Sequence, residues 1–294
     1  MRNTARGERH LTTEQRPRTA ALAVLVLSAI GFVTVYAVGV LTRPGQIVEN
    51  RALDASTFLT RPGGLLSLVS AVNIAIALAV LVVLGLALRR FRPTIRAVGV
   101  VVVSTVLSQL LKNGLLARPD LLGDFSANTL PSGHTVAFAS LLFGLLIVLP
   151  PKPRTVAALV CSVVLGIVVV QLLAFGWHRA SDVVAGLLLV TAIMALAQLL
   201  LPDRGTPSVR SDAGTRTLLV LGALVGLVLL IATVAFAATL ALDVSLATTH
   251  TLLFASEVMC LAAVSLAVMS VLWVQRATPT LLSSRARKST IEGI

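Results

Sequence analysis

Three short polar stretches in this largely apolar chain carry residue types suited to phosphoryl transfer. The first, "LKNGLLARPD", contains the cations Lys112 and Arg118. The second, "NTLPSGHTVAF", contains His134, and the third, "FGWHRASD", contains His178 and Asp182. Cations can neutralise the oxygens of a phosphate, while one imidazole attacks the phosphorus and another protonates the leaving oxygen. The three stretches therefore predict a site for a phosphate-bearing substrate, provided that the fold brings them together.

The third stretch also has the spacing of an oriented histidine. Asp182 follows His178 by four residues, which is about one turn of a helix, so its carboxylate can reach an imidazole nitrogen and select the tautomer. A carboxylate orients the base of a catalytic triad in the same way. Alone, however, such a pair is also a common structural hydrogen bond at a helix end.

The second stretch is typical of a helix start. Ser132 and Gly133 precede an apolar run, and the backbone N-H groups at a helix N-terminus can bind an anion. Each motif also has a purely structural interpretation: the Pro-Ser-Gly sequence as a cap, Lys112 as a residue that extends to the membrane surface, and Arg118 as an interfacial residue. The occurrence of all three motifs favours the functional interpretation.

The composition predicts the elements that must position these residues. The chain has 294 residues, of which 12% are charged, and its mean hydropathy is +0.96, which is typical of an integral membrane protein. The fold class expected is all-α, a polytopic bundle of about eight transmembrane helices, with the first an uncleaved anchor. The predicted spans are 19–42, 64–88, 97–116, 134–150, 156–175, 182–201, 217–241 and 252–275.

The basic residues predict the orientation of this bundle. If the N-terminus is cytoplasmic, 18 of the 24 basic residues lie in cytoplasmic segments, as the positive-inside rule requires. Both termini are then cytoplasmic, and all three polar stretches face the outside of a plasma membrane. The net charge of +12 is thereby explained by topology, and we expect no nucleic-acid partner.

The motifs resemble the three-part signature of the type 2 phosphatidic acid phosphatase superfamily, which includes membrane lipid phosphate and polyprenyl diphosphate phosphatases. The matching segments are Lys112 with Arg118-Pro119, then Pro131 to His134, then His178 to Asp182 followed by Val183 to Gly186. The resemblance covers roughly residues 64 to 201. It implies a phosphatase-like membrane core over 19–201, a cytoplasmic tail over 1–18, two extra transmembrane helices over 202–276 and a cytoplasmic tail over 277–294.

The resemblance also implies a role for each motif residue. His178 is the nucleophile that becomes phosphohistidine, Asp182 holds it, and His134 is the acid for the leaving group. The phosphate is bound by the residues that the other motifs supply, namely Ser132, Gly133, Lys112 and Arg118. The resemblance implies no metal and no cofactor, so the expected reaction is a metal-independent hydrolysis of a phosphoric ester or diphosphate.

Two positions depart from the family pattern. Five residues separate Lys112 from Arg118 where the family has six, so we expect the helix end to turn differently to bring Lys112 to the site. Gln171 and Leu172 stand where the family has Ser-Arg. Since a guanidinium has a long reach and a planar fork, we expect Arg179 to take over part of the work of the missing arginine; contact with lipid headgroups is the alternative for Arg179.

Three functions fit these observations. The first is hydrolysis of a lipid or polyprenyl phosphate or diphosphate on the extracytoplasmic face. The second is transfer of the phosphoryl group to another hydroxyl, and the third is non-catalytic binding of a lipid phosphate by a scaffold protein. Membrane lipids are expected partners in each case, while the sequence does not indicate the lipid or the oligomeric state.

Two further features lie within predicted spans. Glu257 is an ionisable group in the last apolar run, where a hydrogen-bonded structural role is favoured over contact with substrate or a second subunit. Cys161 and Cys260 show neither a disulfide framework nor metal-ligand spacing, which predicts that they pack in the bundle.

Overall fold

The computed structural model describes residues 4–59, 64–123, 127–202 and 249–276, together with positions 222, 226, 227 and 231. The part described is all-helical, as the sequence predicts. Its elements are α1 (Thr4–Val35), η1 (Tyr36–Val40), α2 (Arg43–Asp54), η2 (Gly64–Leu68), α3 (Ala71–Ala87), α4 (Phe91–Leu110), η3 (Leu111–Leu115), α5 (Gly133–Val148), α6 (Pro151–Ala174), α7 (Ala180–Leu200) and α9 (Thr249–Arg276).

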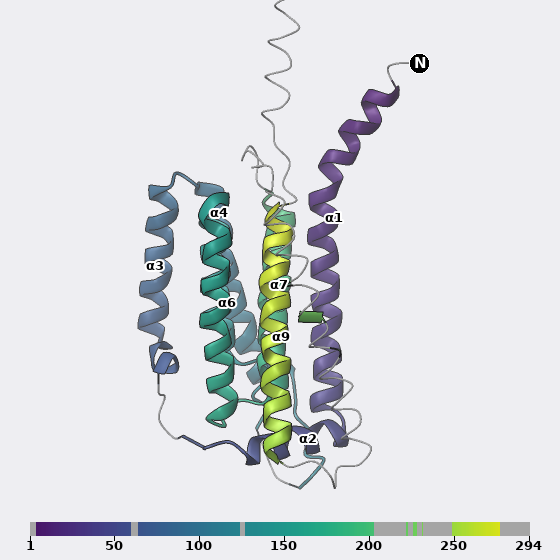
Figure 1. The fold of residues 1–294 in the computed structure, drawn as a ribbon, viewed down its shortest axis with the longest axis vertical. Helices are drawn as coiled ribbons and strands as arrows, with labels where there is room; N and C mark the ends of the chain where they lie inside the picture. The colour runs from purple at the N-terminus through teal and green to yellow at the C-terminus, as the bar shows by residue number, and fades with distance from the viewer. Residues whose placement is uncertain are drawn as a thin grey trace, which may run out of the picture.

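The long helices run side by side as a bundle (Figure 1). Five of the described helices are long and apolar enough to cross a membrane: the segments Arg18–Val40, Phe91–Leu115, Pro151–Ala174, Ala180–Leu200 and Thr249–Gln275. Helices α3 and α5 are apolar but shorter. Many outward side chains of α3 and α6 are large, apolar and exposed, such as Val80 and Val163, as expected for surfaces that contact lipid. The architecture is that of a membrane protein.

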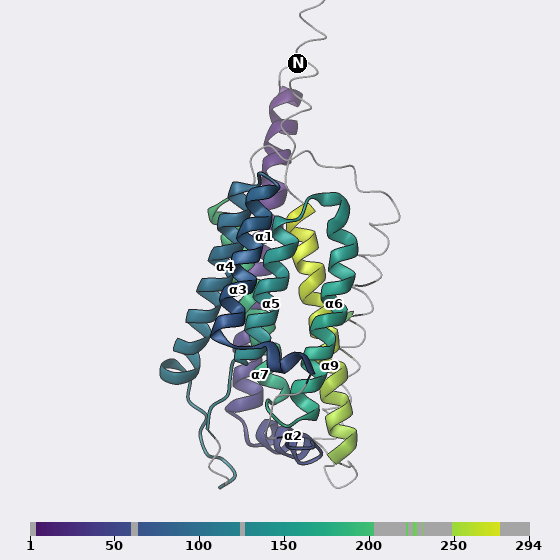
Figure 2. The same ribbon diagram turned by 90° about the vertical axis from the view of Figure 1, so that its left-hand side faces the viewer.

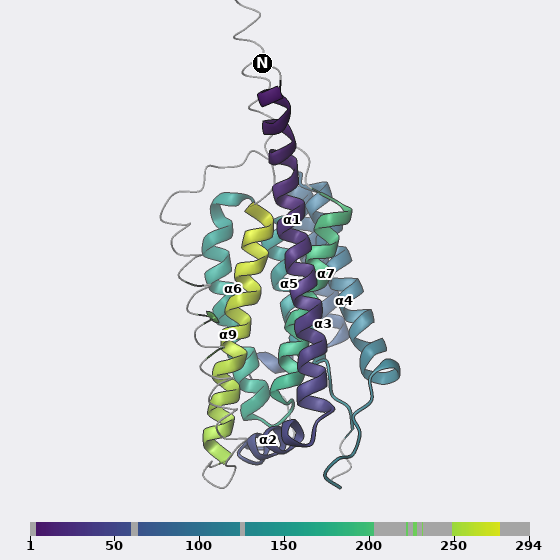
Figure 3. The ribbon, with the colours of Figure 1, turned by 90° about the vertical axis from the view of Figure 1, so that its right-hand side faces the viewer.

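Helix α2 differs from the others because it lies across one end of the bundle (Figures 1 and 2). Helices α1, α4 and α6 finish at this end, and α5, α7 and α9 start there. The described start of α1 and the finish of α9 lie at the opposite end (Figure 3). All three motifs fall at chain positions next to the end covered by α2, which we call the site end.

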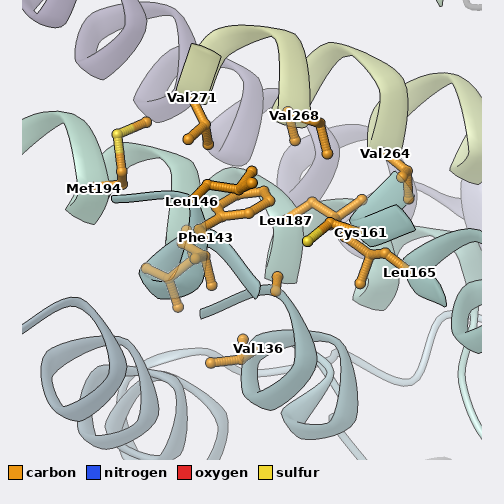
Figure 4. Packing of buried hydrophobic residues seen from close by; sticks show 14 of the residues in the cluster. Val136, Phe143, Leu146, Cys161, Leu165, Leu187, Met194, Val264, Val268 and Val271 are labelled. Atoms are coloured by element: carbon orange, nitrogen blue, oxygen red, sulfur yellow. The ribbon is translucent and has the colours of Figure 1, made fainter. Parts of the chain in front are cut away.

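The core lies where α5, α6, α7 and α9 meet (Figure 4). Phe143, Leu146, Leu165, Leu187 and Val268 are all fully buried there. Close approach of α5 and α7 at the site end depends on Gly186, where a Cβ atom would lie 3.2 Å from Cβ of Thr135 and 3.3 Å from the Ser132 carbonyl oxygen. The core thereby fixes the starts of the two helices that carry the histidines.

The two cysteines are both free and buried in this core, as predicted. Cys161 lies on α6, and Cys260 on α9 approaches the carbonyl of Ala180 at the start of α7, with Sγ 4.0 Å from the oxygen. Burial of the thiols in tight helix contacts accounts for both positions.

The predicted spans agree with α3, α4, α5, α6, α7 and α9 to within seven residues at each end, whereas α1 begins much earlier than predicted, at Thr4. Two other segments need comment. The span predicted at 217–241 lies almost wholly outside the described residues. The segment after the first span was predicted as an outer loop, whereas residues 43–54 form α2. The signals for this helix are local: Thr42 accepts a hydrogen bond from the Gly45 N-H, and Pro44 follows at the start of the helix.

Candidate active site

His178 and Asp182 form a buried pair at the start of α7. His178 Nδ1 lies 3.3 Å from Asp182 Oδ2, and the two side chains are 8% and 0% exposed. The same carboxylate oxygen accepts hydrogen bonds from the Arg179 backbone N-H at 3.0 Å and from the Thr129 hydroxyl at 2.6 Å. Asp182 is therefore fixed by three donors, and it can hold the proton on Nδ1 so that Nε2 of His178 carries the free lone pair.

His134, the second residue of α5, lies beside this pair. Its ring centroid is 6.1 Å from that of His178, with 62° between the ring planes. On its other side, the edge of the ring meets Trp177 at a centroid distance of 5.3 Å. The bundle thus brings together two histidines that are 44 positions apart in the sequence.

The start of α5 is capped as the Pro-Ser-Gly motif predicts. Ser132 Oγ accepts from the Thr135 N-H at 3.3 Å, and the Ser132 N-H donates to the carbonyl of Asp182 at 2.9 Å. The backbone N-H groups of Gly133 and His134 make no hydrogen bond within the described part of the chain. The motif serves as a helix cap and also leaves two donors available for an anion at the start of the helix that carries His134.

The first motif begins in a π-helical turn. Lys112 lies in η3, which continues α4 with wider winding over Leu111–Leu115, so the helix end does turn differently from a regular α-helix. The ammonium of Lys112 lies within electrostatic range of His134. Arg118 follows in the loop, its side chain only 2% exposed and ion-paired with Glu49 at 3.4 Å. The Arg118 Nε is buried and has no hydrogen-bond partner among the described residues.

Arg179 points toward α2 and not outward. Its Nε and Nη2 donate to Asn50 Oδ1 at 3.2 and 3.1 Å, and the residue is 9% exposed. Burial lowers the pKa of Arg179, and the positive charge of nearby Arg118 lowers it further. The two guanidiniums are therefore neighbours, which places Arg179 where it can share an anion with Arg118. Leu172, at the position of the family arginine, is fully buried in the core.

Sequence reasoning missed three residues of this site: Glu49, Asn50 and Thr129. Burial raises the pKa of Glu49 to about 7, and the negative charge of Asp182 adds to the shift. Glu49 and Asn50 belong to α2, while Thr129 lies within the second polar stretch, two residues before Pro131. The sequence gives one indication of these residues: each is polar and lies in a segment predicted on the same side of the membrane as the motifs.

The donor set of the site consists of guanidiniums, an ammonium, imidazoles and N-H groups. Within the described ranges, no cluster of three or more His, Cys, Asp or Glu side chains has the arrangement of a metal site. Glu257 lies on α9, and His250 at the start of that helix is exposed. Neither makes a hydrogen bond or ion pair with the described residues of the site.

Helices that can cross a membrane, together with this cluster, define a membrane protein of the phosphatase type. Residues 64–206 match the family model described as the PAP2 superfamily, in agreement with the resemblance that the three motifs show. The match contains all three motifs and excludes α1, α2 and α9. No curated protein and no solved structure gives a significant match.

Proposed function

We propose that the protein is a phosphatase that hydrolyses a lipid or polyprenyl phosphate or diphosphate through a phosphohistidine at His178. The observation that carries this proposal is the proximity of the His178-Asp182 pair, His134 and two buried arginines at one end of the bundle. An apolar protein with such a site at a bundle end suits a substrate whose tail lies in the bilayer and whose phosphate lies at the surface.

The first chemical step forms a bond between His178 Nε2 and phosphorus while the bond to the leaving oxygen breaks. Asp182 stabilises the positive charge that develops on the His178 ring. His134 gives its proton to the leaving oxygen, and Arg118, Arg179 and Lys112 neutralise the charge on the phosphoryl oxygens. This step ends with the dephosphorylated lipid and a phosphohistidine.

The second step returns the enzyme to its starting state. His134, now neutral, takes a proton from a water molecule, whose oxygen attacks phosphorus as the bond to Nε2 breaks. Inorganic phosphate leaves. If a sugar or lipid hydroxyl takes the place of water, the same chemistry gives phosphotransfer, because nothing in the step depends on the acceptor being water.

Release of phosphate by the purified full-length protein tests this proposal. The panel is phosphatidic acid, diacylglycerol pyrophosphate and undecaprenyl diphosphate in detergent micelles, with and without chelator. We expect release from at least one substrate, unchanged by chelator, because cations and imidazoles supply the charge stabilisation. Activity that is lost with chelator and restored by Mg²⁺ would contradict the mechanism. Folded protein that releases nothing, with or without an added hydroxyl acceptor, would favour the non-catalytic binder.

We further propose that the site end faces the outside of the plasma membrane and that both termini are cytoplasmic. The charge distribution supports this orientation. Asn113 in η3 and Lys152 at the start of α6 are exposed and lie at opposite ends of the bundle. Asn113→Cys should react with an impermeant thiol reagent in intact cells and Lys152→Cys should not, while buried Cys161 and Cys260 leave a low background. The reverse pattern would overturn the orientation.

A further inference from the structure

Helix α2 presents polar side chains to the interior of the protein. Its buried residues are Gln46, Glu49 and Ala52, which lie on one face because they are spaced by three. The helix packs tightly on the π-helical turn that finishes the first span: a Cβ atom at Gly45 would lie 2.1 Å from the Val38 carbonyl oxygen. Only glycine allows this approach, so α2 has a defined position over the site end.

Glu49 joins two separate parts of the site through its two carboxylate oxygens. Oε2 accepts from Arg118 Nη1 and Nη2 at 3.4 and 3.5 Å. Oε1 accepts from the Ser181 N-H at 3.1 Å, in the first turn of α7. One side chain therefore connects the first-motif arginine to the helix that carries His178 and Asp182.

Asn50, the next residue, holds the second guanidinium, that of Arg179. A single oxygen, Oδ1, accepts from both Nε and Nη2 of Arg179. Gln46, one turn earlier, donates to the carbonyl of Pro119 at 2.8 Å. Three residues of α2 thus contact the two segments that supply arginines.

A carboxylate is an unfavourable neighbour for a phosphate binding site. Burying it costs free energy that an apolar residue would not cost, and its negative charge repels an anion. Glu49 offsets these costs only if it orients donors that bind the anion more strongly than it repels it. Glu49 can have that effect because it accepts from Nη1 and Nη2 of Arg118, while Arg118 Nε has no hydrogen-bond partner among the described residues.

We infer that Glu49 and Asn50 are positioning residues, and that α2 sets the geometry of an arginine clamp formed by Arg118 and Arg179. The inference rests on the proposed function, and it assigns to a helix outside the matched residues 64–206 the placement of phosphate-binding groups in the core. Glu49 acts through Arg118, and Asn50 acts through Arg179.

A double-mutant cycle tests the role of Glu49. Glu49→Gln keeps the shape of the side chain and an acceptor for the Ser181 N-H but loses the charge that holds Arg118. It should lower kcat/KM by about 10- to 100-fold, mainly through kcat, because a displaced donor weakens transition-state binding. Glu49→Asp, which keeps the charge, should recover part of the loss. Asp54→Asn makes the same chemical change at an exposed position of the same helix and should leave kcat/KM at the wild-type value.

The double-mutant cycle of Glu49 with Arg118 shows whether Glu49 acts by positioning Arg118 or by a general effect on the structure. If Glu49 acts through Arg118, the double variant Glu49→Gln with Arg118→Gln should be no slower than Arg118→Gln alone. The corresponding cycle of Asn50→Ala with Arg179→Gln should behave in the same way. Losses that multiply in both cycles, or a Glu49→Gln variant within twofold of wild type, would overturn the inference.

Binding of orthovanadate provides a readout that does not depend on turnover. Wild-type protein in detergent should be stabilised against heat by orthovanadate, and Glu49→Gln should need about 10-fold more for the same stabilisation. If the wild type binds orthovanadate in this way but hydrolyses no substrate in the panel, the proposed function fails and the inference stands. If the wild type hydrolyses a substrate and Glu49→Gln leaves the rate unchanged, the proposed function stands and the inference about α2 fails. A wild type that neither hydrolyses any substrate nor binds orthovanadate overturns the proposed function and the inference together.

Discussion

The two ends of the bundle both bury arginines, but they use them differently. At the end opposite the site, Arg90 donates to the Val148 carbonyl at 2.8 Å, and Arg154 donates to that of Leu149 at 2.7 Å. These carbonyl groups lie at the C-terminal end of α5. The last carbonyl groups of a helix have no N-H partner within the helix, so a cationic side chain can bond to them. Arg96 is paired with Gln198 between two helices.

At the site end, the guanidiniums do not cap a helix. Arg118 and Arg179 are held by Glu49 and Asn50 from a separate element, and they lie near each other despite their like charge. Burial of an arginine therefore does not identify a functional residue. What distinguishes the site end is that two guanidiniums converge beside a histidine pair, where Glu49 and Asp182 offset part of their positive charge and a bound anion would offset more.

The largest expected effect is loss of the nucleophile. His178→Ala should lower kcat by at least about 1000-fold, because no other group can form the intermediate. His134→Ala should cost about as much when the leaving oxygen needs a proton, and less for a diphosphate, whose leaving group is better. His250→Ala, at an exposed position of α9, is the control in steady-state assays. Wild-type turnover by His178→Ala would refute the assignment.

The contact between His178 and Asp182 is predictable from the sequence, because the two residues lie close together in the chain. His178 and Asp182 are one helical turn apart, and apolar runs predict the helices that carry them. The contribution of α2 could not be predicted in the same way. Glu49 meets Arg118 across 69 positions and Asn50 meets Arg179 across 129, and a short polar helix at a bundle end has no hydropathy signal.

Comparison of an arginine from each end gives the second prediction. Arg118→Gln should lower kcat/KM by about 100-fold, since it removes a donor to the developing charge, and it should also lower Tm, since it leaves Glu49 without its ion-pair partner. Arg96→Gln should lower Tm, since it disturbs a buried pair, and leave kcat per folded molecule near the wild-type value. Kinetics and thermal unfolding on both variants check this, and equal losses of activity at the two positions would remove the distinction between the ends.

Substitution of Arg179 should lower turnover less than substitution of His178 and about as much as substitution of Arg118. Arg179→Ala should lower kcat by about 30- to 1000-fold if the guanidinium contacts the phosphoryl group in the transition state. Leu172→Arg should not restore the loss, because that side chain is fully buried in the core. Turnover near the wild-type rate in Arg179→Ala would mean that the residue contacts lipid headgroups instead.

Thr129 gives a smaller effect through Asp182. Thr129→Val removes the hydroxyl that donates to Asp182 Oδ2 and should slow turnover by about 10-fold, the typical worth of a hydrogen bond to a charged group. Thr191→Val is a matched control, because its hydroxyl bonds only to a carbonyl within α7. Equal rates for the two variants would show that Asp182 needs no such support.

The last prediction concerns stability instead of turnover, through the titration of Glu49. Its pKa is raised from 4.5 to about 7 in the folded protein, so folding favours the protonated form. The groups that face it are Arg118, Arg179, Asp182 and Cys260. Relative to Glu49→Gln, the wild type should lose about 3 kcal/mol of stability as pH rises from 4.5 through 7, and then level off. Parallel curves of Tm against pH for the two proteins would contradict this.

The most direct test of the central claim is detection of the phosphohistidine. Purified protein is mixed with phosphatidic acid or diacylglycerol pyrophosphate labelled in the terminal phosphate, quenched in alkali within milliseconds and digested for mass spectrometry. The account predicts an acid-labile, alkali-stable phosphoryl group on His178 in the wild type and its absence in His178→Ala. A phosphoryl group on His134 or another residue, or hydrolysis in which no phosphoenzyme forms at any quench time, would contradict it.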